Sequence, residues 1–146
     1  MTIGGTNRTD RGVASLLPVE IAEQAEAIGV QKTNLDLLSL LALAVLAGSF
    51  IALGAMFATT VLAGADGFLP FGLGRLLAGI AFCLGLILVI VGGAELFTGN
   101  ALMVMAWAAG KIQLRQMLRA WLIVYIGNFI GAIGTASRTH WMMPHV

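Results

Sequence analysis

The sequence predicts an all-α membrane protein with three transmembrane spans, the second of them broken by a loop at mid-membrane depth. Apolar residues make up 59% of the 146-residue chain and charged residues 10%, with a mean hydropathy of +0.95. Such a balance does not build a water-soluble surface. Uncharged runs long enough to span a bilayer occupy residues 37–65, 76–94 and 120–137.

The chain before the first span predicts two different segments. Residues 1–15 are rich in Gly, Thr and Asn, which is typical of a disordered N-terminus. Residues 16–28 combine an apolar stripe with three glutamates, and Pro18 stands where a helix starts. We expect an amphipathic helix that lies along the membrane interface and ends near Gly29. A helix that docks a partner is the alternative.

The first span, at about residues 35–63, contains Gly48 and Gly54, and Gly64 follows directly after it. Small residues let helices pack closely in lipid, where the hydrophobic effect does not drive helix association. We therefore expect this span to be packed closely against other helices.

The second segment, at about residues 75–109, carries the most informative pattern. As one helix, residues 76–110 would be about 52 Å long, against about 30 Å of hydrocarbon. We expect a break near residues 92–98, within a polar and Gly-rich loop formed by Gly92, Gly93, Ala94, Glu95, Gly99 and Asn100. Backbone freed at that depth must be buried in protein or line an aqueous path. Alternatively, the glycines only permit a kink.

We expect a second half-helix over about residues 98–109, capped by Thr98 or Asn100. Its N-terminus would present amides suited to an anion. The carboxylate of Glu95 could tune a pore, but we expect it to be structural, bonded to loop amides or paired with another polar group, since it would repel an anion.

The third span is predicted at about residues 117–136, with Trp121 and Tyr125 near an interface. We interpret Asn128 as a helix-to-helix hydrogen-bonding residue in preference to a substrate ligand. The tail at residues 137–146 holds both histidines, His140 and His145. Two histidines beside two methionines are a weak metal constellation, and we predict no metal site.

Six of the eight Lys and Arg residues lie before span one or between spans two and three. Both segments face the same side of the membrane, which the positive-inside rule makes cytoplasmic. We expect an integral protein of the bacterial inner (plasma) membrane with a cytoplasmic N-terminus.

At GGAELFT (residues 92–98) the sequence resembles the formate/nitrite transporters. The resemblance extends to PVEIA (18–22), GSFIALG (48–54), LGLIL (84–88) and WLIVYIGNFIGA (121–132), and covers about residues 16–134. It implies half of an aquaporin-like inverted-repeat fold, assembled as a homopentamer with one pore per protomer. It also implies transport of small monovalent anions such as formate or nitrite.

The resemblance assigns pore residues one by one. Phe82 and Leu86 match an outer apolar constriction, whereas Leu96, Phe97 and Thr98 match an inner one. Apolar rings exclude hydrated ions but pass a neutral weak acid. In the family, the threonine lies near a proton-donating histidine of the fifth helix.

That histidine has no counterpart here, and the tail after Gly134 departs from the family pattern, so we expect a truncated half of a transporter. The rival interpretations are a non-functional truncated product, a three-span interaction protein, and a water or glycerol channel. The alternative partner is a separately encoded second half. No catalytic, cofactor or nucleic-acid motif is present, so we predict neither an enzyme nor a cofactor.

Overall fold

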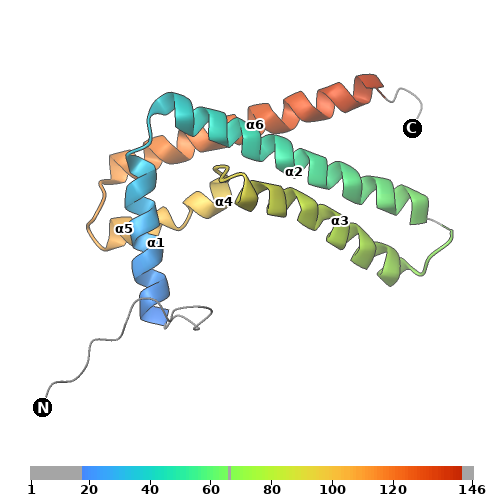
Figure 1. The fold of residues 1–146 in the computed structure, drawn as a ribbon, viewed down its shortest axis with the longest axis horizontal. Coiled ribbons are helices and arrows are strands. Elements are labelled where there is room, and N and C mark those ends of the chain that lie inside the picture. Colours follow the sequence, from blue (N-terminus) through green and yellow to red (C-terminus); the bar gives the residue numbers. More distant parts are fainter. Residues whose placement is uncertain (1–17, 66, 143–146) are drawn as a thin grey trace, which may run out of the picture.

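The computed structural model describes residues 18–65 and 67–142, and this part of the chain is all-helical (Figure 1). The predicted disordered segment 1–15 and His145 lie outside the described residues. The helices, in chain order, are α1 (Pro18–Thr33), α2 (Leu37–Ala65), α3 (Phe71–Val91), α4 (Phe97–Asn100), α5 (Met103–Ala108) and α6 (Leu114–Met142).

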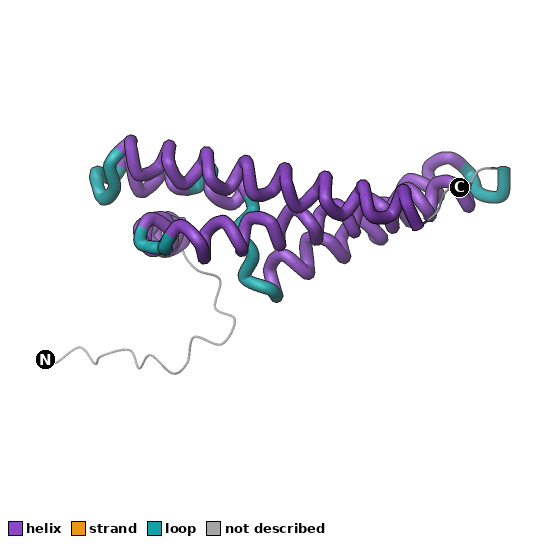
Figure 2. The backbone as a smooth tube through the Cα atoms, turned by 90° about the horizontal axis from the view of Figure 1, so that it is seen from above, coloured by secondary structure: helices purple, strands orange, loops and turns teal. Residues whose placement is uncertain are grey.

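Three of these helices are long and apolar enough to cross a membrane, over Leu37–Ala65, Phe71–Val91 and Leu114–Arg138. They run side by side as an elongated bundle, in which α2 packs against both α3 and α6 (Figures 1 and 2). Helix α1 crosses one end of this bundle, where it packs on α5 (Figure 1). The three predicted spans are therefore present as helices.

The close packing of α2 depends on glycines on both sides of each contact. A Cβ added to Gly48 would collide with the backbone of Asn128 on α6, and one added to Gly131 would collide with the backbone of Val45. On the other face, a Cβ on Gly54 would lie 2.9 Å from the Phe82 carbonyl oxygen of α3. Close approach of small residues is how helices gain van der Waals contact in lipid. Gly64 differs, because no atom would lie within 4 Å of its Cβ.

The buried core lies at the α1 end of the bundle, where α1, α2, α5 and α6 meet. Its members are Leu40, Ala44, Met103, Ala106, Ile112, Met117, Ala120 and Val124. Large apolar side chains remain exposed along α3 and α6, such as Ile90 at 78% and Leu122 at 62%. In a bilayer these faces meet lipid or further protein rather than water.

Several predicted helix ends are wrong. Helix α1 continues through Gly29 to Thr33 because that glycine is buried in a helix contact, where its Cβ would lie 2.9 Å from the Ala106 Cβ. Helix α6 begins three residues before position 117 and continues past 136 to Met142. Its polar residues 137–139 do not stop it, and the next proline is Pro144.

Helix α2 begins at Leu37 because Asp36 precedes it as a cap. The Asp36 carboxylate accepts a hydrogen bond from the Ser39 backbone amide at 3.0 Å. Hydrogen bonds from Ser39, first through its side chain and then through its backbone, lower the pKa of Asp36. Such a cap satisfies an amide that the first turn of a helix leaves unpaired.

Replacing Gly131 by alanine should destabilise the protein by about 1–3 kcal/mol, because the added methyl group has no room against α2. Gly134→Ala on the same helix is the matched control, since nothing lies within 4 Å of that position. Alanine there should be neutral or gain up to about 1 kcal/mol from helix propensity. Thermal unfolding in detergent, followed by circular dichroism, measures both. Equal melting temperatures for the two variants would contradict the close α2–α6 contact.

Candidate functional site

Helix α3 begins at Phe71, four residues before the predicted start, and ends at Val91; the non-helical residues 92–96 that follow are called the elbow. Helix α3 closes with bonds from the Gly92 amide to the Leu88 carbonyl (2.8 Å) and from the Ala94 amide to the Val89 carbonyl (2.9 Å). Gly93 has φ +59°, in the left-handed region that favours glycine. The chain then extends at Leu96, with φ −95° and ψ 136°, before α4 begins.

The predicted cap of the second half-helix is wrong. Leu96 precedes α4 without a side-chain cap, while Thr98 and Asn100 lie inside the helix. The half-helix expected over 98–109 is also divided into α4 and α5. The leading amide of α4, that of Phe97, donates to the Asn128 Oδ1 atom at 2.9 Å. A protein side chain thus occupies the donor that we expected an anion to meet.

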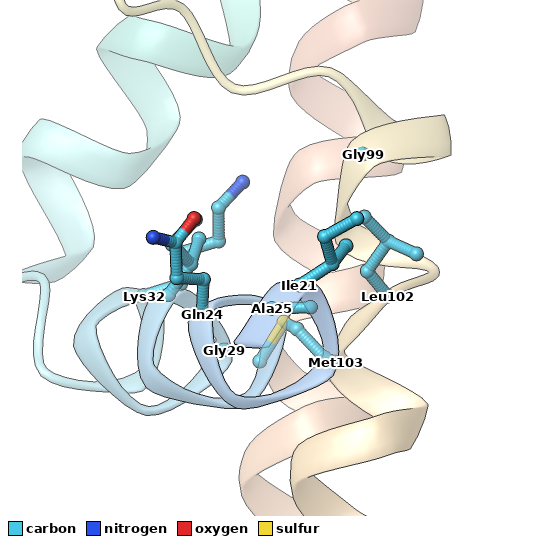
Figure 3. Close-up of a pocket in the computed structure, with 9 residues that line it drawn as sticks. Ile21, Gln24, Ala25, Gly29, Lys32, Gly99, Leu102 and Met103 are labelled. Atoms are coloured by element: carbon cyan, nitrogen blue, oxygen red, sulfur yellow. The ribbon is translucent and has the colours of Figure 1, made fainter. Parts of the chain in front are cut away.

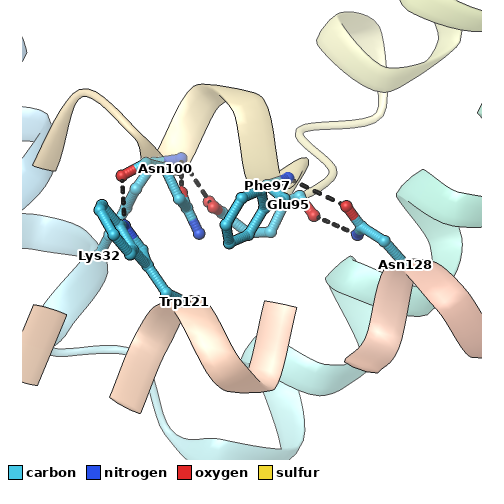
Figure 4. A network of polar contacts seen from close by, with 6 residues as sticks. All are labelled: Lys32, Glu95, Phe97, Asn100, Trp121 and Asn128. Carbon is cyan, nitrogen blue, oxygen red and sulfur yellow. Dashed lines mark hydrogen bonds and ion pairs between the residues drawn. The ribbon is translucent and has the colours of Figure 1, made fainter. Parts of the chain in front are cut away.

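Asn128, from the middle of α6, fastens the elbow to the bundle (Figure 4). Its Oδ1 atom accepts from the Phe97 amide, and its Nδ2 atom donates to the carbonyl oxygen of Ala44 on α2 (2.8 Å) and to that of Glu95 (2.9 Å). The Glu95 amide adds a bond to the Leu43 carbonyl oxygen at 3.2 Å. Asn128 is therefore an interhelical hydrogen-bonding residue, and its side chain also satisfies backbone groups of the elbow.

A second group of polar residues lies on the α1 side of the elbow. The Lys32 ammonium of α1 donates to the Glu95 carboxylate and to the Asn100 Oδ1 atom, both at 2.6 Å. The Trp121 indole N–H donates to the Asn100 carbonyl oxygen at 2.8 Å (Figure 4). Glu95 is 8% exposed and Asn100 is fully buried. The Glu95 charge is thus neutralised inside the protein, by an ion pair to a helix that precedes all three spans.

The pairing of Glu95 with another polar group agrees with our expectation, but the sequence did not identify Lys32 as the partner. A usable signal was present: Glu95 is the one charge within residues 76–110. A charge in that setting needs an opposite partner because burying it alone is costly. The lysine nearest to the first span was the available cation.

The aromatic residues of α6 pack against the elbow side of α4. The Phe97 ring makes edge-to-face contacts with Trp121 (centroids 5.9 Å apart) and Tyr125 (5.7 Å). Offset geometry of this kind is favoured by the ring quadrupoles. The two α6 rings, which we expected at an interface, therefore position Phe97.

The residues predicted to form constrictions fall into two sets. Leu96, Phe97 and Thr98 lie together where the elbow meets α4, and Leu96 and Phe97 are half-buried. Thr98 is exposed, and its side chain has no hydrogen bond to another described residue. Phe82 and Leu86 lie one turn apart on α3. Phe82 and Leu86 precede Gly92 by ten and six residues, which places them about 15 Å and about 9 Å from the elbow along the α3 axis.

A cavity of about 350 Å³ lies between α1 and the α4–α5 segment (Figure 3). It is lined by Ile21, Gln24, Ala25, Ile28, Gly29, Lys32, Gly99, Leu102 and Met103. The five constriction residues do not line it. Lys32 both lines this cavity and forms the ion pair with Glu95. Its side chain is therefore partly accessible, with 18% exposed.

Lys32→Met should destabilise the protein by about 1–3 kcal/mol, because it leaves the buried Glu95 carboxylate unpaired. The double variant Lys32→Met/Glu95→Gln removes both charges and should recover at least half of that loss. Chemical unfolding in detergent measures the single and double variants in one thermodynamic cycle. Additive losses would contradict the ion pair.

Comparisons with known proteins agree with this all-helical membrane fold. The family profile described as Formate/nitrite transporter matches residues 19–144. This range includes most of segment 137–146, for which the sequence predicted divergence. A solved FNT family ion channel has the same fold, with a TM-score of 0.73 at 24% identity over 84% of this chain and 49% of that chain.

Two curated relatives show the extent of the similarity. The formate channel FocA of Escherichia coli K12 is 43% identical over 126 residues, which are 86% of this chain and 44% of the relative. The uncharacterized transporter YrhG of Bacillus subtilis 168 is 44% identical over 82% of this chain and 45% of its own length. The chain spans about half the length of these relatives. It is an integral membrane protein and belongs to the formate/nitrite transporter family.

Proposed function

We propose that this chain forms half of a transmembrane pathway for small monovalent anions of the formate or nitrite kind. The observation that carries the proposal is the elbow, a non-helical backbone segment held against α6 by Asn128. Asn128 is the ninth of the 18 uncharged residues 120–137. At 1.5 Å per residue the elbow therefore lies near the middle of the hydrocarbon. Irregular backbone at that depth is tolerated where it is buried in protein or lines a water-filled path, and a pathway beside the elbow meets this condition.

The chemistry of the elbow suits a weak acid. Leu96 and Phe97 supply an apolar constriction, and the exposed Thr98 hydroxyl supplies a hydrogen bond beside it. Protonation of the anion avoids moving a charge through hydrocarbon. The ion pair to Lys32 removes the objection that Glu95 would repel an anion, since the pair carries no net charge.

The relatives named as formate channels support formate as a substrate, and they are about twice as long as this chain. We propose that a second half completes the pore wall and covers part of the exposed α3 face, for example Ile90 and Val91. By the family resemblance, the completed protomer forms a homopentamer.

We further propose that the α1 end of the bundle is cytoplasmic. The Lys111 ammonium of the α5–α6 turn pairs with Glu26 of α1 at 2.6 Å, which brings α1, with its Lys32, and the basic α5–α6 turn to one end. An excess of basic residues on one side is typical of the cytoplasmic face.

Uptake of labelled formate and nitrite into proteoliposomes under a pH gradient tests the proposal. Two preparations are compared: this chain alone, and this chain co-assembled with the C-terminal half of the Escherichia coli FocA relative. We expect uptake above empty vesicles in the second preparation. No anion uptake by the assembled halves, or glycerol flux in its place, would overturn the proposal.

Thr98→Val in the co-assembled protein should lower formate flux about tenfold or more, because the isosteric side chain cannot hydrogen-bond the substrate. Assembly should be unchanged, since Thr98 is exposed. The matched control is Thr60→Val on α2, whose hydroxyl bonds only the Met56 carbonyl oxygen of its own helix. Equal flux in both variants would remove Thr98 from the mechanism.

Phe97→Ala should widen the inner constriction and reduce selectivity between formate and larger monocarboxylates about threefold or more. Competition uptake with acetate and lactate measures the change. Phe129→Ala, on an exposed face of α6, is the matched control. Selectivity that stays at the original value in the Phe97 variant would make the ring a packing residue only.

A further inference from the structure

We propose that the first two turns of α6 bind an anionic phospholipid. A shallow groove of about 550 Å³ lies on this part of the helix, lined by Leu114, Arg115, Leu118, Arg119 and Leu122. The inference does not depend on the transport activity proposed above.

The two arginines of this groove, Arg115 and Arg119, supply its positive charge. Within the part of the chain that the structure describes, neither forms an ion pair, whereas the nearby Lys111 is already paired with Glu26. All seven acidic residues of the sequence precede position 96, so α6 offers no carboxylate of its own. Two guanidinium groups one turn apart suit the bidentate recognition of a phosphate.

The leucines make a free inorganic anion a poor match for the same groove. Leu114, Leu118 and Leu122 recur every four residues, which places them on one side of the helix next to the arginines. Each is between 46% and 62% exposed. An occupant that satisfies both halves of the groove has an anionic head and an apolar chain, which describes a phospholipid.

The position along the helix agrees with this occupant. The uncharged run of α6 begins at Ala120, directly after Arg119. Leu114 to Leu122 covers about 12 Å of helix, comparable to the headgroup layer plus the upper part of one hydrocarbon leaflet. Helix α1 crosses the bundle at this same end, where it also contacts α6 (Figure 1).

Native mass spectrometry of the purified chain in detergent tests the proposal. Phosphatidylglycerol and phosphatidylcholine with identical acyl chains are titrated separately. We expect one phosphatidylglycerol retained in preference to phosphatidylcholine. Arg115→Gln/Arg119→Gln should weaken phosphatidylglycerol binding about 25-fold, because each basic residue near an anionic headgroup contributes about fivefold. Leu118→Ser, with both arginines intact, should also weaken it, by about threefold.

Arg138→Gln is the matched control, since this exposed arginine lies at the opposite end of α6. It should change binding less than twofold. Circular dichroism checks that each variant keeps its helices, as expected for exposed positions. Unchanged phosphatidylglycerol binding in the double variant, or an equal loss with Arg138→Gln, would overturn the proposal. A second copy of the chain retained in place of lipid would also overturn it.

Discussion

The structure depends on satisfying the backbone groups that are left without helical partners between the end of α3 and the start of α4. Each unpaired N–H or C=O group in hydrocarbon costs several kcal/mol. One side chain, that of Asn128, forms hydrogen bonds with the Phe97 amide, the Glu95 carbonyl oxygen and the Ala44 carbonyl oxygen. Its position is in turn fixed by the contact between Gly48 and the Asn128 backbone. Helix packing and the shape of the elbow are therefore one constraint.

The ion pair on the other side of the elbow joins a surface helix to the interior. Lys32 reaches from the last turn of α1 to Glu95 and Asn100. The cavity beside α1 leaves the lysine partly accessible, while the carboxylate is buried. Moving α1 away from the elbow would therefore break this ion pair. This makes α1 an integral part of the elbow's support rather than an appendage at the interface.

Much of the architecture could be predicted from the sequence. Run length and the absence of charge located the three long helices, and the pair Gly92 and Gly93 located the end of α3. Local sequence signals failed to predict helix ends and caps at positions where tertiary contacts determine the structure. Gly29 was interpreted as a helix stop, but it serves the contact with Ala106. Thr98 and Asn100 have capping chemistry, yet the Phe97 amide is satisfied from α6.

The partners of polar residues were hardest to predict, because they are distant in sequence. Lys32 and Glu95 are separated by 63 positions, and Trp121 and Asn100 by 21. The periodicity of apolar residues in the sequence does not indicate such pairs. The roles of Phe82, Leu86, Leu96, Phe97 and Thr98 in a pore rest on resemblance, and remain predictions.

The Gly-lined contact between α2 and α6 also bears on how the protein is made. These two helices fit together most closely, yet 48 residues lie between Ala65 and Leu114. At ribosomal speeds of about 5–20 residues per second, α6 emerges roughly 2–10 s after α2 is complete. During that interval the glycine-containing face of α2 lacks the helix against which it packs in the folded protein. This face must therefore stay exposed to lipid, or be shielded by the insertion machinery, until α6 enters the bilayer.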